Sequence, residues 1–70
     1  MKDRTEAERR KAAMAHFWAA IEELAAKKKI GRKMLYKELK AQLEIGSVTD
    51  LDSAEIDDLA FEMEATAAHL

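Results

Sequence analysis

The sequence contains no cysteine and no proline, and only two of its 70 residues are glycine. Without cysteine, neither a disulfide nor a thiolate metal site can stabilise the fold. Long apolar runs are also missing: the longest stretch without a formal charge, residues 12–21, covers ten residues and is too short to span a bilayer as a helix. No apolar segment typical of a signal peptide follows the basic N-terminus. We therefore expect a cytoplasmic protein without a membrane anchor.

Basic residues are missing from the last part of the chain. All 12 lysines and arginines lie within residues 1–40, together with six acidic residues, which gives this segment a net charge of +6. Residues 41–70 contain eight acidic side chains and no basic one, a net charge of −8, and the total of −2 hides this division. Such a charge distribution steers association with oppositely charged partners. It is typical of a binding module.

The composition is rich in alanine, leucine, glutamate and lysine, which favour helices. Thr5 with Glu8, and Asp52 with Glu55, have the spacing of capping boxes. Together with apolar residues at helical spacing, these signals predict three amphipathic helices over residues 6–29, 32–44 and 53–68. We expect Gly31 to end the first helix or to redirect the chain, and Gly46 to cap the end of the second helix.

These elements predict a single all-α domain, residues 1–70, folded as a small three-helix bundle. A chain this short buries only about 60% of its unfolded surface, so we expect self-association or a partner to add stability.

Four alanines on one side of the first helix form either a dimer seam or an ordinary surface; they are Ala12, Ala15, Ala19 and Ala26. The predicted apolar stripes are Ala13, Phe17, Ala20, Ile21 and Leu24; Leu35, Leu39 and Leu43; and Ile56, Leu59, Ala60, Met63 and Ala67. The connector before the third helix is expected to be extended. Its apolar residues are expected to cover the end of the bundle; they are Ile45, Val48 and Leu51.

Few residues could carry catalysis. His16 and His69 are the only histidines, and no metal-ligand spacing connects them, so we interpret both as structurally incidental. No glycine-rich phosphate loop is present, and paired carboxylates need a shaped cleft for acid–base chemistry. We predict that the protein is not an enzyme and has no metal or cofactor.

The predicted third helix is the main candidate for a partner-binding surface. Given 3.6 residues per turn, Phe61 lies about 140° from Ile56 around the helix axis, outside the apolar stripe and among carboxylates. An exposed aromatic ring with a polar rim is typical of an interface anchor. Alternatively, Phe61 packs against the first helix in a bundle that is rotated relative to this estimate. The candidate partner-binding residues are Asp57, Asp58, Phe61, Glu62, Glu64 and Ala65.

A basic cluster is the alternative candidate surface. Clustered lysines and arginines can bind phosphates, although the same pattern also describes an ordinary solvated helix face. A helix-turn-helix reading of duplex DNA is disfavoured because its second helix would be the acidic third helix, which phosphates repel. The residues of this candidate nucleic-acid patch are Lys27, Lys28, Lys29, Arg32, Lys33, Lys37 and Lys40.

Four short segments in the second half form a pattern: Leu35-Tyr36-Lys37-Glu38-Leu39-Lys40, Ile45-Gly46-Ser47, Asp50-Leu51, and Ile56-Asp57-x-Leu59. The pattern resembles the small helical C-terminal module of phage antirepressors of the Rha type. Val48 stands where that family often has an aromatic residue. We expect the module to stand here without a large N-terminal domain, closer in size to very small prophage antirepressors. The resemblance implies a phage or prophage regulator in a bacterial host that binds a repressor protein, and it implies no catalytic residue.

The leading hypothesis is therefore an antirepressor that binds a transcriptional repressor and blocks its DNA contact, with the third helix as the contact element. One alternative is a nucleic-acid-binding regulator that uses the basic cluster, with the acidic half held away from the duplex. Another alternative is a self-assembling bundle, possible as a homodimer, in which the basic second helix of one copy meets the acidic third helix of another.

Overall fold

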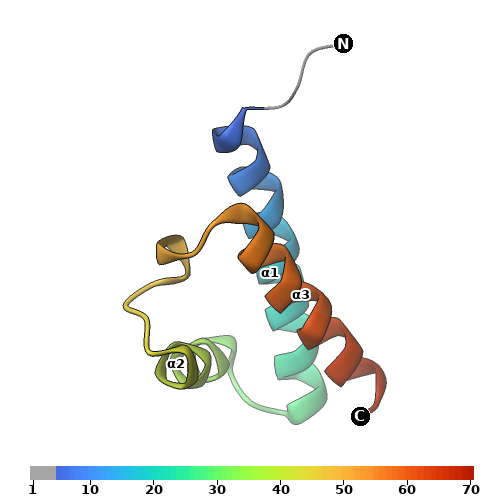
Figure 1. The fold of residues 1–70 in the computed structure, drawn as a ribbon. Coiled ribbons are helices and arrows are strands. Elements are labelled where there is room, and N and C mark those ends of the chain that lie inside the picture. The colour runs from blue at the N-terminus through green and yellow to red at the C-terminus, as the bar shows by residue number, and fades with distance from the viewer. Residues whose placement is uncertain (1–4) are drawn as a thin grey trace.

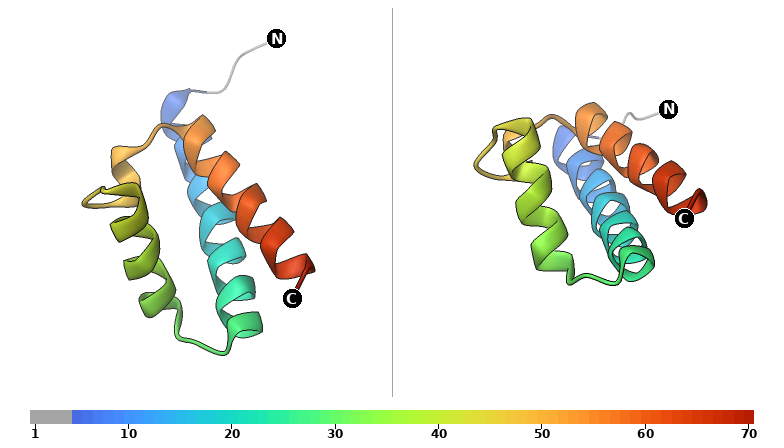
Figure 2. Two further views of the ribbon diagram at one scale, coloured as in Figure 1. Left: turned by 60° about the horizontal axis from the view of Figure 1, so that its bottom comes forward. Right: turned by 90° about the horizontal axis from the view of Figure 1, so that it is seen from below.

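The computed structural model describes residues 5–70 and contains three helices (Figure 1). They are α1 (Glu6–Lys28), α2 (Arg32–Leu43) and α3 (Ser53–Ala68), and a 3₁₀ turn, η1 (Val48–Asp50), lies in the last connector. Helices α1 and α3 run in the same direction, and α2 runs in the opposite direction. In both views of Figure 2, α1 lies between α2 and α3. The predicted all-α three-helix bundle is confirmed. Among the described residues, no helix combines the length and the apolar character needed to cross a membrane.

Two capping boxes fix where α1 and α3 begin. Thr5 Oγ1 accepts a hydrogen bond from the Glu8 backbone N–H at 3.2 Å, and Asp52 Oδ1 accepts one from the Glu55 N–H at 2.8 Å. In each case the glutamate carboxylate accepts the backbone N–H of the capping residue in return. These bonds satisfy backbone donors that have no partner within the helix. Both helix starts agree with the sequence prediction.

Helices α1 and α2 each end one residue before the predicted bound. The capping residues differ from the prediction, because the helices are not closed by Gly31 and Gly46. Lys29 and Glu44 close α1 and α2 in the left-handed region, with φ of 61° and 56°, whereas neither Gly31 nor Gly46 has a positive φ. The backbone N–H of Ile30 bonds to the carbonyl of Ala25, and Ile45 bonds in the same way to Lys40. This is the Schellman arrangement, in which an apolar residue follows the left-handed position. At the end of α1 this apolar residue, Ile30, packs against the core, a hydrophobic contact that frequently accompanies a left-handed cap.

The core lies mainly between α1 and α3, which pack along their length, and α2 adds less to it. Most of the predicted apolar stripes are buried, including Phe17, Ile21 and Ile56. The prediction for α2 is only partly right, because Leu39 is half-buried and Leu43 is 39% exposed. Leu35, near the start of α2, is buried, so the last turn of α2 extends beyond the core.

The connector before α3 is held by side chains from both other helices. The Arg10 guanidinium of α1 donates to the carbonyl oxygens of Leu51 at 2.8 Å and Thr49 at 2.6 Å. Tyr36 Oη of α2 accepts the backbone N–H of Val48 at 3.0 Å, and Val48 is buried. Val48 therefore plugs the core as predicted, but through the 3₁₀ turn η1 and not through the extended connector that the sequence suggested.

Candidate functional site

Helix α3 presents most of the predicted partner-binding residues to solvent. Asp58, Phe61, Glu62 and Ala65 are exposed, whereas Asp57 and Glu64 are half-buried. The Phe61 side chain is 61% exposed and so lies outside the core, as the helical spacing predicts. No lysine or arginine lies in α3, so this helix itself carries no permanently basic side chain.

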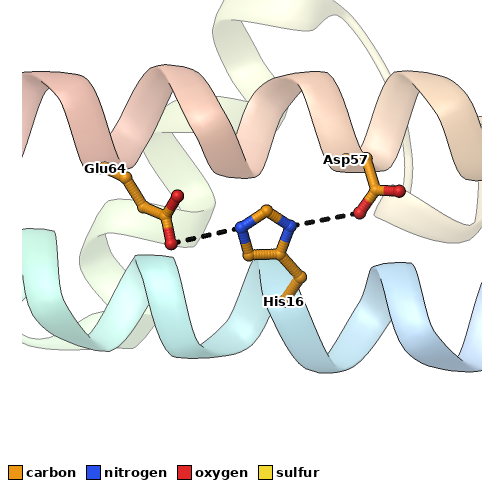
Figure 3. Close-up of polar contacts among 3 residues, drawn as sticks. All are labelled: His16, Asp57 and Glu64. Carbon is orange, nitrogen blue, oxygen red and sulfur yellow. Dashed lines mark hydrogen bonds and ion pairs between the residues drawn. The ribbon is translucent and has the colours of Figure 1, made fainter.

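His16 of α1 joins the two half-buried carboxylates of α3 (Figure 3). Its Nδ1 lies 3.1 Å from Asp57 Oδ1, and its Nε2 lies 3.1 Å from Glu64 Oε2. A carboxylate can only accept, so both contacts are hydrogen bonds only when both ring nitrogens carry a proton. We call this trio the His16 clasp. The sequence interpretation of His16 as structurally incidental is wrong.

The Phe61 ring contacts the same histidine. The ring centroids of His16 and Phe61 are 4.7 Å apart at an angle of 78°, an edge-to-face arrangement. Asp57, Phe61 and Glu64 are spaced four and three residues apart, so they lie on one side of α3. The sequence shows this spacing, but it does not show which side of α1 packs against these three residues. The contact holds one edge of Phe61 while most of the ring stays exposed.

The His16 clasp makes stability depend on pH. The hydrogen bond to Asp57, followed by that to Glu64, raises the pKa of His16 above its ordinary value of 6.5. A raised folded-state pKa contributes stability that is complete below the unfolded value and is lost as the pH rises through the folded value. Because the carboxylates are half-exposed, we expect only about 0.5–1 kcal/mol. Melting at about pH 6 should therefore occur roughly 2–8 °C higher than at about pH 9.

Thermal unfolding followed by circular dichroism at both pH values would measure this difference. His16→Gln should remove it, and His69→Gln, a change of the other histidine at the exposed end of α3, should leave it in place. If His16→Gln kept the full pH dependence, another group would be its source.

The other carboxylates of α3 line a groove between α2 and α3. Two adjoining hollows of about 210 and 230 Å³ share Leu59 and Glu62 as lining residues. We call them together the α2–α3 groove. Its apolar lining is Leu24, Leu35, Leu39, Leu43, Leu51, Leu59 and Met63. Its charged lining is Lys28, Glu38, Glu55, Asp58 and Glu62. The predicted acidic site is thus divided: Asp57 and Glu64 face α1, and Asp58 and Glu62 face the groove.

The predicted basic cluster spreads over the end of α1 and one side of α2. Arg32 forms an ion pair with Glu22 at 2.9 Å, and the Lys40 ammonium lies 4.7 Å from the centre of the Tyr36 ring. A separate hollow of about 330 Å³ is lined by Trp18, Arg32, Lys33 and Tyr36. Trp18 is 37% exposed and meets Tyr36 edge to face, with centroids 4.9 Å apart. The remaining members, Lys27, Lys28, Lys29 and Lys37, are exposed.

Within residues 5–70 no group of three or more histidine, aspartate or glutamate side chains is gathered closely enough to hold a metal ion. The alanines that could form a dimer seam, Ala12, Ala15, Ala19 and Ala26, are exposed in the single chain. No protein-family model matches this chain, and no curated protein or solved structure is significantly similar to it. Inference about function therefore depends on the surfaces described above.

Proposed function

We propose that this chain is a small regulatory protein of the antirepressor kind, which binds a transcriptional repressor and blocks its DNA contact. The DNA-binding face of a repressor is basic because it meets phosphates. An acidic helix with a protruding aromatic side chain complements such a face in charge and offers an apolar anchor. The contact element is α3, through Asp58, Phe61, Glu62 and Ala65.

The observation that carries this proposal is the exposure of Phe61 on a helix without basic residues. Its side chain is 61% exposed, and the neighbouring Asp58 and Glu62 are also exposed. Among the described residues, no ion pair of Asp58 or Glu62 with a lysine or arginine is present. The charges on this face therefore stay available to a partner.

Substitution of Phe61 by alanine is expected to weaken binding to the repressor by more than about 1 kcal/mol, or roughly fivefold. The experiment uses the chain as bait for DNA-binding proteins of its host and measures the affinity of the captured repressor for each variant by calorimetry. A mobility-shift assay then tests whether the chain releases that repressor from its operator.

Met34→Ala is the matched control, because Met34 is a similarly exposed apolar side chain on α2, at 55%. It should leave the affinity unchanged, and circular dichroism should show equal helix content for both variants. Equal affinity of the Phe61→Ala variant and the unchanged chain would count against this site.

A second candidate function, nucleic-acid binding, is favoured by the hollow beside Trp18. Exposed aromatic rings next to arginine and lysine are typical of single-strand binding, where bases stack and phosphates pair with cations. If the chain acts in this way, a single-stranded oligonucleotide should quench the fluorescence of Trp18, the only tryptophan, and added salt should reverse the effect. Unchanged fluorescence at low salt, and no shift of duplex DNA by the chain alone, would remove this candidate.

A further inference from the structure

We propose that the α2–α3 groove binds an amphipathic helix of a partner protein, whose apolar stripe is flanked by lysines or arginines. The inference rests on the proposed function and deepens it, since it names the kind of segment that the partner contributes. The groove shares Asp58 and Glu62 with the contact element of the proposed function but does not include Phe61, so Phe61→Ala and Leu43→Ser test the two apart.

The groove has the shape and the lining that a helix needs. It follows α3 from Glu55 to Thr66, a rise of about 16 Å, or three turns of a helix. Its floor is apolar and partly accessible, because Leu39, Leu51 and Leu59 are half-buried and Leu43 is 39% exposed. Helix-in-groove recognition uses apolar side chains at successive turns against such a floor.

The charges at the edge of the groove select a basic occupant. Four carboxylates line it, from Glu38, Glu55, Asp58 and Glu62, against a single ammonium group from Lys28. None of these four is joined in an ion pair within residues 5–70. A helix with lysines or arginines on both sides of its apolar stripe meets these groups, whereas a nucleic acid is repelled by them.

A second copy of this chain fits the groove less well. Helices α1 and α3 turn their main apolar stripes into the core of the chain, with Phe17 and Ile56 buried. In α2, Leu35 is buried, whereas Leu39 and Leu43 already form part of the groove itself. The lysines of α2 lie beside Tyr36 and Trp18, or are exposed, and do not flank a free apolar stripe. A separate partner supplies both features together.

The test uses the full chain, labelled with ¹⁵N, and a synthetic peptide of about 14 residues. The peptide has leucines at spacings of three and four residues, lysines beside them and alanines elsewhere. Binding is followed by amide chemical shifts. We expect the largest shifts at residues that line the groove, and a loss of affinity of about tenfold for Leu43→Ser.

Two charge variants of the same helix give a matched comparison. Asp58→Asn with Glu62→Gln removes two charges from the groove, and Asp57→Asn with Glu64→Gln removes two from the opposite side. Affinity for the peptide should fall at least about threefold in the first pair and stay unchanged in the second. Melting curves confirm that each variant is folded at the temperature used.

Several results would overturn the inference. Equal binding of a peptide with the same composition but scattered leucines, or an equal effect of both charge pairs, would mean attraction by net charge alone. Largest shifts around Trp18 or Phe61 would place the contact elsewhere. A dimer of the chain alone in sedimentation, dissociated by Leu43→Ser, would make a second copy the occupant. In each case, weaker repressor binding by the Phe61→Ala variant would still support the proposed function. Unchanged repressor binding by that variant would argue against the proposed function and not against peptide binding in the groove.

Discussion

Replacement of Phe17 by alanine is expected to remove about half of the protein's free energy of unfolding at 25 °C. The Phe17 side chain is 1% exposed and is one of the three largest side chains that are fully buried. Its ring also contacts those of Trp18 and Tyr36 edge to face, with centroids 5.2 and 6.1 Å apart. Truncation of a buried phenylalanine costs about 3–5 kcal/mol. A domain of this length has roughly 4–10 kcal/mol of total stability, with small domains near the lower limit.

Urea unfolding followed by circular dichroism measures this effect, and the chain contains its own matched control. Phe61→Ala makes the same chemical change on α3 at a side chain that is 61% exposed, and it should cost less than about 1 kcal/mol. A Phe17→Ala variant with the same free energy of unfolding as the unchanged chain would contradict the assignment of the core. A stable Phe61→Ala variant is also the condition for interpreting its loss of partner binding as a local effect.

Replacement of Arg10 by alanine is expected to cost about 2–3 kcal/mol, since hydrogen bonds to charged groups are worth about 1.5–3 kcal/mol. One guanidinium donates to two carbonyl oxygens of the connector, those of Thr49 and Leu51. Lysine should not restore the loss, because a single ammonium group lacks the planar pair of donors. Among the described residues, the hydrogen bonds of the Tyr36 hydroxyl with Val48 and Ser47 would then be the remaining side-chain hydrogen bonds from α1 or α2 to the connector.

Urea unfolding again gives the free energy of unfolding for each variant. Arg9→Ala is the control, because Arg9 precedes Arg10 in α1 and its side chain is exposed; it should change stability by less than about 0.5 kcal/mol. Equal stability of the two alanine variants would show that the connector does not need Arg10.

The sequence predicted the local features of the fold well. Helix starts follow from side chains within three residues of the capping residue, as with Thr5 and Asp52, and the periodic apolar residues define the helices themselves. The residues that cap the ends of α1 and α2 were predicted less well. The prediction depended on Gly31 and Gly46 and did not consider the apolar residues that complete a Schellman motif, Ile30 and Ile45. Leu43 continues the periodic apolar stripe of α2. It is partly exposed because the last turn of α2 does not pack against α1.

The candidate surfaces were predicted only as far as a single helix allows. Helical spacing placed Phe61 outside the core, because that conclusion depends on α3 alone. The His16 clasp and the α2–α3 groove depend on which sides of two helices face one another, and no local pattern fixes that. For the same reason the acidic residues of α3 looked like one cluster, although Asp57 and Glu62 lie on different sides of the folded helix.

The pairing of α1 with α3 has a consequence for synthesis on the ribosome. Residues 41 positions apart meet in this pair, as His16 and Asp57 do. Helix α3, which packs along α1 over the core that contains Phe17 and Ile21, is made after both other helices. A nascent chain must therefore keep these apolar side chains from aggregation until α3 emerges from the exit tunnel. Premature termination within α3 would leave them uncovered, so such fragments should be rapidly degraded substrates of cellular proteases.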